Sequence, residues 1–192
     1  MADLVGHLET YLGEIAGGWS RDAAGVPMRF QVVRFDDRPD QGLVTYSTLG
    51  LSHHVIHLPT KAVRQELVMT VRRRFEGAHI VSLLATVGGW MLERHQALLR
   101  GEVLRNGGGI PEGGALASLY AAAPGMLPDA FATMSTTDPP TVFVWLIPVS
   151  DEEAGLVATH GWPWFEERLL EQQPDLFDLQ RATIIHGQTR VE

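Results

Sequence analysis

Three histidines stand close together in the segment 52–57 and are the residues best suited to metal chemistry. Neutral imidazoles bind zinc, and His53 and His57 are four residues apart, a spacing that places two side chains on one face of a helix. The segment has no HExxH pattern, and the Leu58–Pro59 pair directs the chain away from helix. We therefore expect His53, His54 and His57 to lie in a solvated turn without a metal ion, and a histidine-dependent metalloenzyme is the alternative.

Other patterns that resemble catalytic sites lack an essential part. Glu93 and His95 are two residues apart in a predicted helix, and such positions do not face each other. The Gly-rich run Asn106–Gly114 lacks the GKS or GKT ending of a phosphate loop, and its Glu112 would repel phosphate. No serine lies in a GxSxG pattern. We expect the Gly-rich run to be a loop or hairpin connection, and we expect no catalytic residue and no cofactor.

Acidic residues crowd the stretch 151–178 and surround a tryptophan. At 100° per residue, Trp164 falls on the side of a predicted helix that carries Glu167 and Glu171. A large aromatic ringed by charge is typical of an interface anchor. The alternative is that Trp164 packs beneath the turn 174–177. We predict that a protein partner binds through Trp164, Glu167, Glu171, Asp151, Glu152, Asp175 and Asp178.

The net charge of −8 is carried by the C-terminal half of the chain. Residues 1–96 contain ten acidic and ten basic residues, whereas residues 97–192 contain thirteen acidic and five basic residues. Such a field disfavours nucleic acid and favours a basic protein partner. The run Arg72–Arg74 lacks the reinforcing bases and aromatics of a nucleic-acid patch. We expect it to form a solvated edge or to pair with the acidic half.

Length and composition bound the class of protein. A chain of 192 residues suits one domain with a sizeable core, so we predict a single domain over 1–192. The absence of cysteine excludes disulfides and thiolate metal sites. No apolar run approaches the roughly 18–20 residues that span a bilayer, and the N-terminus reads as an amphipathic helix, not as a signal peptide. We expect no membrane partner and a cytoplasmic location.

Periodicity indicates the elements that must position these residues. Apolar spacing predicts helices over 3–16 and 77–100, and the Gly88–Gly89 pair inside the second one predicts a close packing contact or a kink. The stretch 124–141 is expected to be a loop. Thr141–Val149 is nearly all apolar, which predicts a strand buried on both faces. The other predicted strands are Met28–Phe35, Leu43–Thr48, Ala62–Arg72 and Ala115–Ala122.

Two short helices are predicted after the last strand. Ser150 is a good N-cap, and Glu153 three residues later completes a capping box. Gly161 ends the first helix, and the second one follows directly, with an apolar face formed by Trp162, Phe165 and Leu169. Strands and helices interleave without a regular βαβ rhythm. The fold class predicted from this order is α+β, a mixed sheet with helices packed on it.

Three stretches, in this order, resemble the suppressor-of-fused domain. Tyr46–Ser52 is similar to the aromatic-x-x-x-Gly-Leu-Ser turn of that family, and Glu66–Met69 is similar to its Glu-Leu strand. The stretch Thr141–Arg181, with its IPV, SDEE, HGWPWFEERL and PDLFDLQR pieces, resembles the C-terminal part of the domain. The match spans residues 27–181. It implies an α/β sandwich that binds other proteins and does not act as an enzyme.

The resemblance implies two roles. Animal members use this domain together with an additional C-terminal domain to bind a transcription-factor peptide. We expect that second domain to be absent here, because eleven residues follow Arg181. Where animal members carry acids after the Gly-Leu-Ser turn, this chain has His53 and His54. Bacterial single-domain members are similar to immunity proteins encoded beside polymorphic toxins. We therefore expect an immunity protein that binds a basic toxin domain, and a regulator or scaffold that adds a peptide to a sheet edge is the alternative.

Overall fold

One mixed sheet organises the chain, which a computed structural model describes over residues 4–22, 24–105 and 116–184. In these residues the sheet has nine strands, in the order β1-β2-β3-β5-β9-β7-β6, with β4 paired to β5 and β8 paired to β9. The strands are β1 (Gly17–Arg21), β2 (Pro27–Asp36), β3 (Leu43–Leu49), β4 (Ile56–His57), β5 (Ala62–Arg72), β6 (Val103–Leu104), β7 (Leu116–Ala122), β8 (Thr133–Met134) and β9 (Thr141–Ser150).

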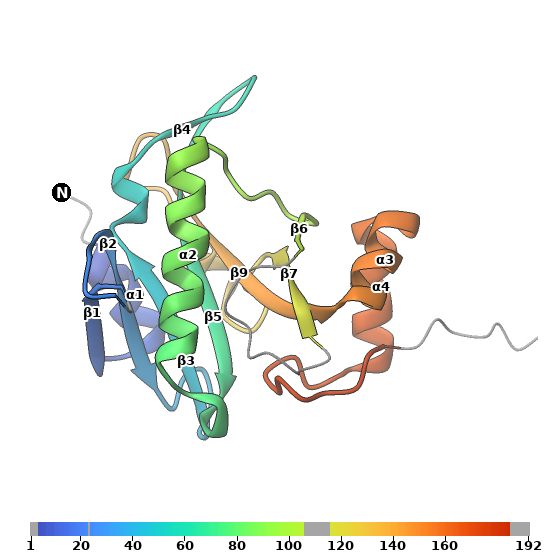
Figure 1. Ribbon diagram of the computed structural model, residues 1–192. Helices are drawn as coiled ribbons and strands as arrows, with labels where there is room; N and C mark the ends of the chain where they lie inside the picture. The colour runs from blue at the N-terminus through green and yellow to red at the C-terminus, as the bar shows by residue number, and fades with distance from the viewer. Residues whose placement is uncertain (1–3, 23, 106–115, 185–192) are drawn as a thin grey trace, which may run out of the picture.

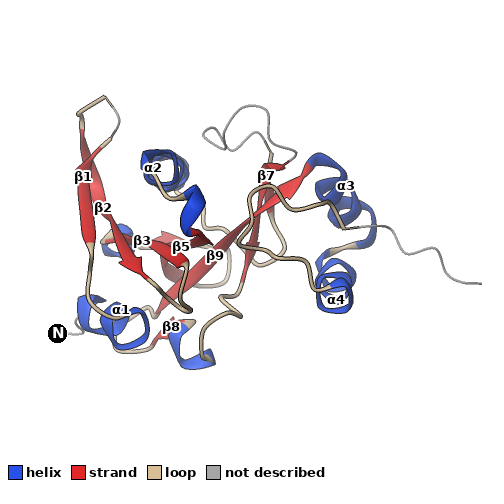
Figure 2. Cartoon of the chain, turned by 90° about the horizontal axis from the view of Figure 1, so that it is seen from below, coloured by secondary structure: helices blue, strands red, loops and turns tan. Residues whose placement is uncertain are grey.

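Helices cover both faces of the sheet. Those in the described residues are α1 (Leu4–Leu12), α2 (Ala78–Arg94), α3 (Asp151–His160) and α4 (Trp162–Gln172), with short 3-10 helices at Leu51–His53, Arg73–Phe75 and Asp129–Phe131. The helix α2 lies on one face and α1 on the other, while α3 and α4 lie together beyond the end of β9 (Figures 1 and 2). The prediction of an α+β fold, a mixed sheet with helices packed on it, is confirmed.

The sheet opens where two parallel strands part. The strands β5 and β9 pair in parallel from Arg64↔Thr141 to Val68↔Trp145. Beyond that point β9 pairs only with β7 and curves away from β5 toward α3 (Figure 1). The chain after α4 returns to the end of β5, where the Arg72 amide donates to the Phe177 carbonyl at 2.9 Å. The C-terminal segment therefore links the two strands that have separated.

The strand β9 is buried on both faces, as its apolar sequence predicts. Val144 and Leu146 belong to the core beneath α2, whereas Phe143 belongs to the core beneath α1. Trp145 and Ile147 join a third cluster, which includes Phe165 of α4 and fixes α3 and α4 beside the sheet. Burial of these large side chains supplies the main free energy that holds the two C-terminal helices in place.

Several boundaries differ from the sequence predictions. The first helix ends at Leu12, before residue 16, because Gly13 takes a left-handed φ of 76°. The long helix ends at Arg94, before residue 100, because His95 also takes a left-handed conformation. The edge strand β1 escapes prediction because its GGWSR sequence shows no apolar alternation, and the expected loop 124–141 contains β8. The Gly-rich run 106–114 lies outside the described residues.

Gly88 confirms the predicted packing contact inside the long helix. A Cβ atom built on Gly88 would lie 2.4 Å from Cζ of Phe30 on β2, a distance that forbids any side chain there. The neighbouring Gly89 has nothing within 4 Å of the same position. The glycine pair therefore contains one residue that lets α2 approach the sheet closely, and its cost in helix propensity is offset by this contact.

A buried carboxylate joins the first two stretches of the resemblance. Glu66 on β5 accepts hydrogen bonds from the amides of Gly50 and Ser52 and from the hydroxyl groups of Thr48 and Ser52. Gly50 has a left-handed φ of 95°, so this turn favours glycine. Burial raises the pKa of Glu66, and the four hydrogen bonds only partly oppose that rise. The Glu-Leu strand thus holds the Gly-Leu-Ser turn in place.

The raised pKa of Glu66 predicts a specific pH dependence of stability. Above the ordinary value of 4.5 the unfolded chain releases the Glu66 proton while the folded protein still holds it, so the free energy of unfolding falls as pH rises through this window. Glu66→Gln lacks this proton. We expect wild type to lose stability relative to Glu66→Gln as pH rises from 4.5, measured by urea unfolding. Parallel stability profiles for the two proteins would contradict the assignment.

A second buried carboxylate ties the C-terminal segment to β9 and α3. Glu153 completes the predicted capping box, because its side chain accepts from the Ser150 amide while its own amide donates to the Ser150 hydroxyl. The same carboxylate pairs with Arg181 at 2.6 Å and accepts from the Ile184 amide at 2.9 Å. Arg181 also donates to the Pro148 carbonyl at 3.0 Å. Three segments of the chain therefore meet at one carboxylate.

Removal of the guanidinium at this junction is expected to be costly. Arg181→Met leaves the Glu153 charge buried without its cation, and breaking such a pair costs about 3–5 kcal/mol. The matched control is Arg74→Met, which removes an exposed pair with Asp178 and is expected to cost under about 1 kcal/mol. Urea unfolding compares the two variants. Equal losses of stability would show that the buried Arg181–Glu153 pair stabilises the protein no more than the exposed Arg74–Asp178 pair does.

Candidate functional site

Three of the four large apolar side chains that are well exposed in the described residues come from two segments that contact each other. They are Leu99 at 46%, Trp162 at 38% and Leu170 at 77%. Leu99 follows α2, whereas Trp162 and Leu170 belong to α4. The fourth, Val26, lies on the β1–β2 connection. We define the Trp162 surface as Leu99, Arg100, Trp162, Glu166 and Leu170.

An ion pair and a cation–π contact join the Leu99–Arg100 segment of the Trp162 surface to α4. Arg100 forms an ion pair with Glu166, and the carbon of its guanidinium lies 4.5 Å from the centroid of the Trp162 ring. Tyr120 donates its hydroxyl to Glu166 at 2.8 Å. The hydrogen bond to Glu166 raises the pKa of Arg100, and burial together with Glu166 raises that of Tyr120. Both groups therefore keep their protons and fix the Glu166 carboxylate.

Gly101 lets the tryptophan approach the backbone. It has a left-handed φ of 91°, and a Cβ atom at this position would lie 2.5 Å from Cγ of Trp162. Any side chain at residue 101 would therefore displace the indole. Trp162 is thus an exposed aromatic whose position is fixed by Gly101 beneath it and Arg100 beside it.

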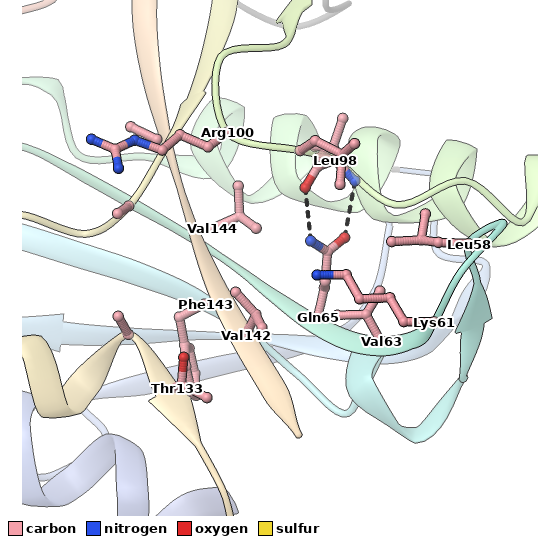
Figure 3. Close-up of a pocket in the computed structure, with 14 residues that line it drawn as sticks. Leu58, Lys61, Val63, Gln65, Leu98, Arg100, Thr133, Val142, Phe143 and Val144 are labelled. Atoms are coloured by element: carbon pink, nitrogen blue, oxygen red, sulfur yellow. Dashed lines mark hydrogen bonds between the residues drawn. The ribbon is translucent and has the colours of Figure 1, made fainter. Parts of the chain in front are cut away.

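An apolar pocket of about 270 Å³ lies beside Leu99, which forms part of its wall. Its floor consists of Val63 on β5 and Val142 and Val144 on β9, where these strands are still paired. Leu98 covers the pocket from above, and Lys61 stands at its side (Figure 3). A mainly apolar hollow next to exposed apolar residues suits an apolar side chain of a bound protein.

Gln65 holds the segment that covers the pocket. Its side-chain amide donates to the Leu98 carbonyl at 2.8 Å and accepts from the Leu98 amide at 2.9 Å (Figure 3). The two bonds satisfy both backbone groups of a buried residue that belongs to no helix or strand. Because Leu99 and Arg100 follow directly, this clamp fixes the start of the Trp162 surface relative to β5.

The predicted binding residues of the acidic stretch divide into three groups. Asp175 pairs with Arg72 at 2.7 Å, and Asp178 pairs with Arg74 at 2.6 Å, so the basic run does bind the acidic half, as one expectation proposed. Glu171 and Glu167 lie 2.6 and 3.4 Å from the Arg168 guanidinium. At the start of α3, Asp151 accepts weakly from Ser118, and Glu152 is exposed.

The exposure of two tryptophans on α4 differs from what the helical period predicts. Trp164 is half-buried, with its ring centroid 4.4 Å from that of His160, and like Phe177 it packs against the third core cluster. Trp162, expected on the apolar face with Phe165 and Leu169, is exposed, whereas those two are buried. The physical reason is that Trp162 begins α4 and meets Gly101, while the following turns meet the core. The helical period gives the face of a residue but not its neighbours.

The histidines of the 52–57 segment lie around a turn, as expected. His53 ends a short 3-10 helix, and His57 lies on β4; both side chains are exposed. Within the described ranges, no group of three or more His, Asp or Glu side chains is placed to hold a metal ion. No helix in those ranges is long and apolar enough to cross a bilayer.

Comparison with known proteins supports the fold and the family resemblance. A family model described as suppressor of fused protein matches residues 27–182. The chain is 18% identical over 155 residues to immunity protein YqcF of Bacillus subtilis (strain 168), covering 80% of this chain and 81% of that one. Its fold is similar to that of a suppressor of fused homologue from Neisseria gonorrhoeae FA 1090, with a TM-score of 0.73, 18% identity and 96% of each chain covered. A chain in the crystal structure of the Sufu–Fu complex gives a TM-score of 0.71 and 12% identity, with 94% of this chain and 90% of that chain covered.

The Gln65 clamp gives a prediction that needs no partner. Gln65→Leu removes both hydrogen bonds and leaves a buried amide and carbonyl at Leu98 unsatisfied, at a cost of about 1–3 kcal/mol for each such group. We expect faster hydrogen exchange at the Leu98 amide and lower stability. Gln96→Leu, at an exposed position two residues before Leu98, is the control and should change neither the exchange nor the stability. Unchanged exchange at Leu98 in Gln65→Leu would show that the clamp does not fix this segment.

Proposed function

This chain belongs to the suppressor of fused protein family, and from that premise we propose that it acts by binding another protein through the Trp162 surface, without catalysis. The observation that carries the proposal is an indole that is 38% exposed and yet fixed by Arg100 and Gly101. Tryptophan and arginine are the residues that most often dominate protein interfaces. The Sufu–Fu complex supports the proposal, because a relative with this fold is found there in a complex.

The residues of the Trp162 surface are already held in place by contacts within this chain. An interface loses affinity when side chains and loops must be ordered on association. Here Gln65 fixes Leu98, the Arg100–Glu166 pair joins the segment to α4, and the indole already has its final neighbours. The adjacent pocket offers space for an apolar side chain of the partner, and Lys61 stands beside it. A partner therefore orders few groups of this chain when it binds.

We further propose that the partner is a toxin domain that this chain neutralises. The relative from Bacillus subtilis is named an immunity protein, which supports this role. Residues 97–192 carry the whole net charge of −8, so a basic toxin domain would be steered toward the half that contains α4. Glu152, Glu167 and Glu171 remain the predicted charged contacts, because they are exposed, whereas Asp175 and Asp178 are partly covered and pair with Arg72 and Arg74.

Substitutions on the Trp162 surface test the proposal. The chain is co-expressed with the toxin encoded beside it, and growth and complex formation are measured. Trp162→Ala is expected to weaken the complex by at least about 2 kcal/mol, roughly thirtyfold, because it removes the central anchor. Leu99→Asp is expected to abolish protection, since it places a charge at the apolar rim. The matched control is Val26→Asp, at an exposed apolar residue outside this surface, which should protect as wild type does.

Stability must be measured beside binding. The free energies of unfolding of Trp162→Ala and Leu99→Asp show how much of any loss of protection comes from lost stability, because these side chains are only 38% and 46% exposed and also contact other parts of this chain. Full protection by both variants would contradict the proposed surface, and failure of the wild-type chain to bind the toxin would contradict the proposed partner. A fall of the association rate with rising salt would support steering by the acidic half.

A further inference from the structure

A separate pocket of about 250 Å³ gathers nitrogen-bearing side chains from distant parts of the sequence. Arg29 comes from β2, His53 and His54 come from the turn after β3, and His95 follows the last residue of α2. Val55, Ile56, Met91 and Leu92 complete the lining. None of these residues belongs to the Trp162 surface or to the pocket beside it. In the sequence, His53 and His54 stand together with His57, far from His95, and the fold brings His53, His54 and His95 together with an arginine.

The turn that carries two of the histidines is fixed by the buried carboxylate. Glu66 holds the amides of Gly50 and Ser52, and a Cβ atom on Gly50 would lie 3.3 Å from the His53 ring. The His53 imidazole therefore folds back over this turn. His95 is fixed at the helix end by its left-handed conformation, with its amide bonded to the Met91 carbonyl. The pocket is thus assembled by rigid elements and not by a loose loop.

The polar side chains that line the pocket can donate hydrogen bonds. Its described lining contains one guanidinium and three imidazoles and no carboxylate. The other charged or titratable groups on the elements that carry or adjoin the lining are Arg34 and Asp36 on β2, His79, Glu93 and Arg94 on α2, His57 on β4, and Arg64, Glu66 and Arg72 on β5. Glu66 is buried within the turn, Arg64 donates to the carbonyls of Ser52 and His53, and Glu93 lines the adjoining hollow together with Arg29. All of these residues belong to the half in which acids and bases balance.

We propose that this pocket binds an oxyanion, either a phosphate-like group or a carboxylate, and binds it more tightly as pH falls. Arginine presents donors in a fork that matches such oxygens, and a protonated imidazole adds charge and a second donor. The imidazoles do not come together as a metal-ligand set in the described residues, so hydrogen-bond donation is the chemistry that they share. The inference does not depend on the partner proposed for the Trp162 surface.

Sulfate and acetate are the probes, because both keep their charge between pH 5.5 and 7.5. Each is titrated into the full-length protein while the imidazole Cε1–H resonances are followed by nuclear magnetic resonance. We expect the resonances of His53, His54 and His95 to move together, while those of His7 and His160 stay in place. Binding should tighten at least about tenfold from pH 7.5 to 5.5, because imidazoles in general pass from mostly neutral to mostly protonated over this range and the protonated form adds charge and a second donor.

Two exposed arginines provide matched variants. Arg29→Gln removes the permanent charge of the pocket and should weaken binding at both pH values, whereas Arg94→Gln lies outside the lining and should bind as wild type does. If the three histidine resonances move with sulfate alone, the ligand is a phosphate-like group. If they also move with acetate, carboxylates are ligands too. The proposal is overturned if neither ion moves the three resonances, or if Arg29→Gln and Arg94→Gln behave alike.

Discussion

The C-terminal third of the molecule depends on one buried ion pair. The Glu153 carboxylate accepts from the end of β9 and from the Ile184 amide, and it binds the Arg181 guanidinium, with both side chains almost wholly buried. A charge in such a place is tolerated only when its partner and its hydrogen bonds are complete. The pair therefore fixes the direction of α3 and the return of the chain together. Since α4 lies between them in sequence, its position relative to the sheet follows from the same junction.

The parting of β5 and β9 explains why a binding surface arises beside α4. Where the strands are paired, they provide the floor of the apolar pocket, and Gln65 holds the segment above it. Where they part, the third core cluster and the two C-terminal helices fill the space beyond β9. The Arg100–Glu166 pair then joins the segment over the strands to the helix beyond them. The Trp162 surface is the seam between these two parts, and its apolar residues are exposed because neither part covers them.

Local signals in the sequence predicted local structure well. The buried strand and the capping box at Ser150 each depend on a few neighbouring residues. The glycine pair indicated a close contact at Gly88 but not its partner Phe30, and the basic run indicated an acidic partner but not that Arg72 would pair with Asp175. The exposure of Trp162 was missed because it depends on Gly101, sixty-one positions earlier in the chain. The oxyanion pocket was missed for the same reason, since its four donors come from three separate segments. Hydrophobic periodicity predicts which face of a helix or strand carries a residue. A site also depends on which elements those faces contact in the fold.

The central claim, that a protein partner binds at the Trp162 surface, is tested most directly by hydrogen exchange on a complex of this chain with the toxin domain proposed as its partner. The account predicts new protection at residues 98–101 and in the first turns of α4, with the rest of the sheet unchanged. Protection along the open edge at β1, with residues 98–101 and α4 exchanging as in the free protein, would contradict it and would favour addition of a strand to the sheet.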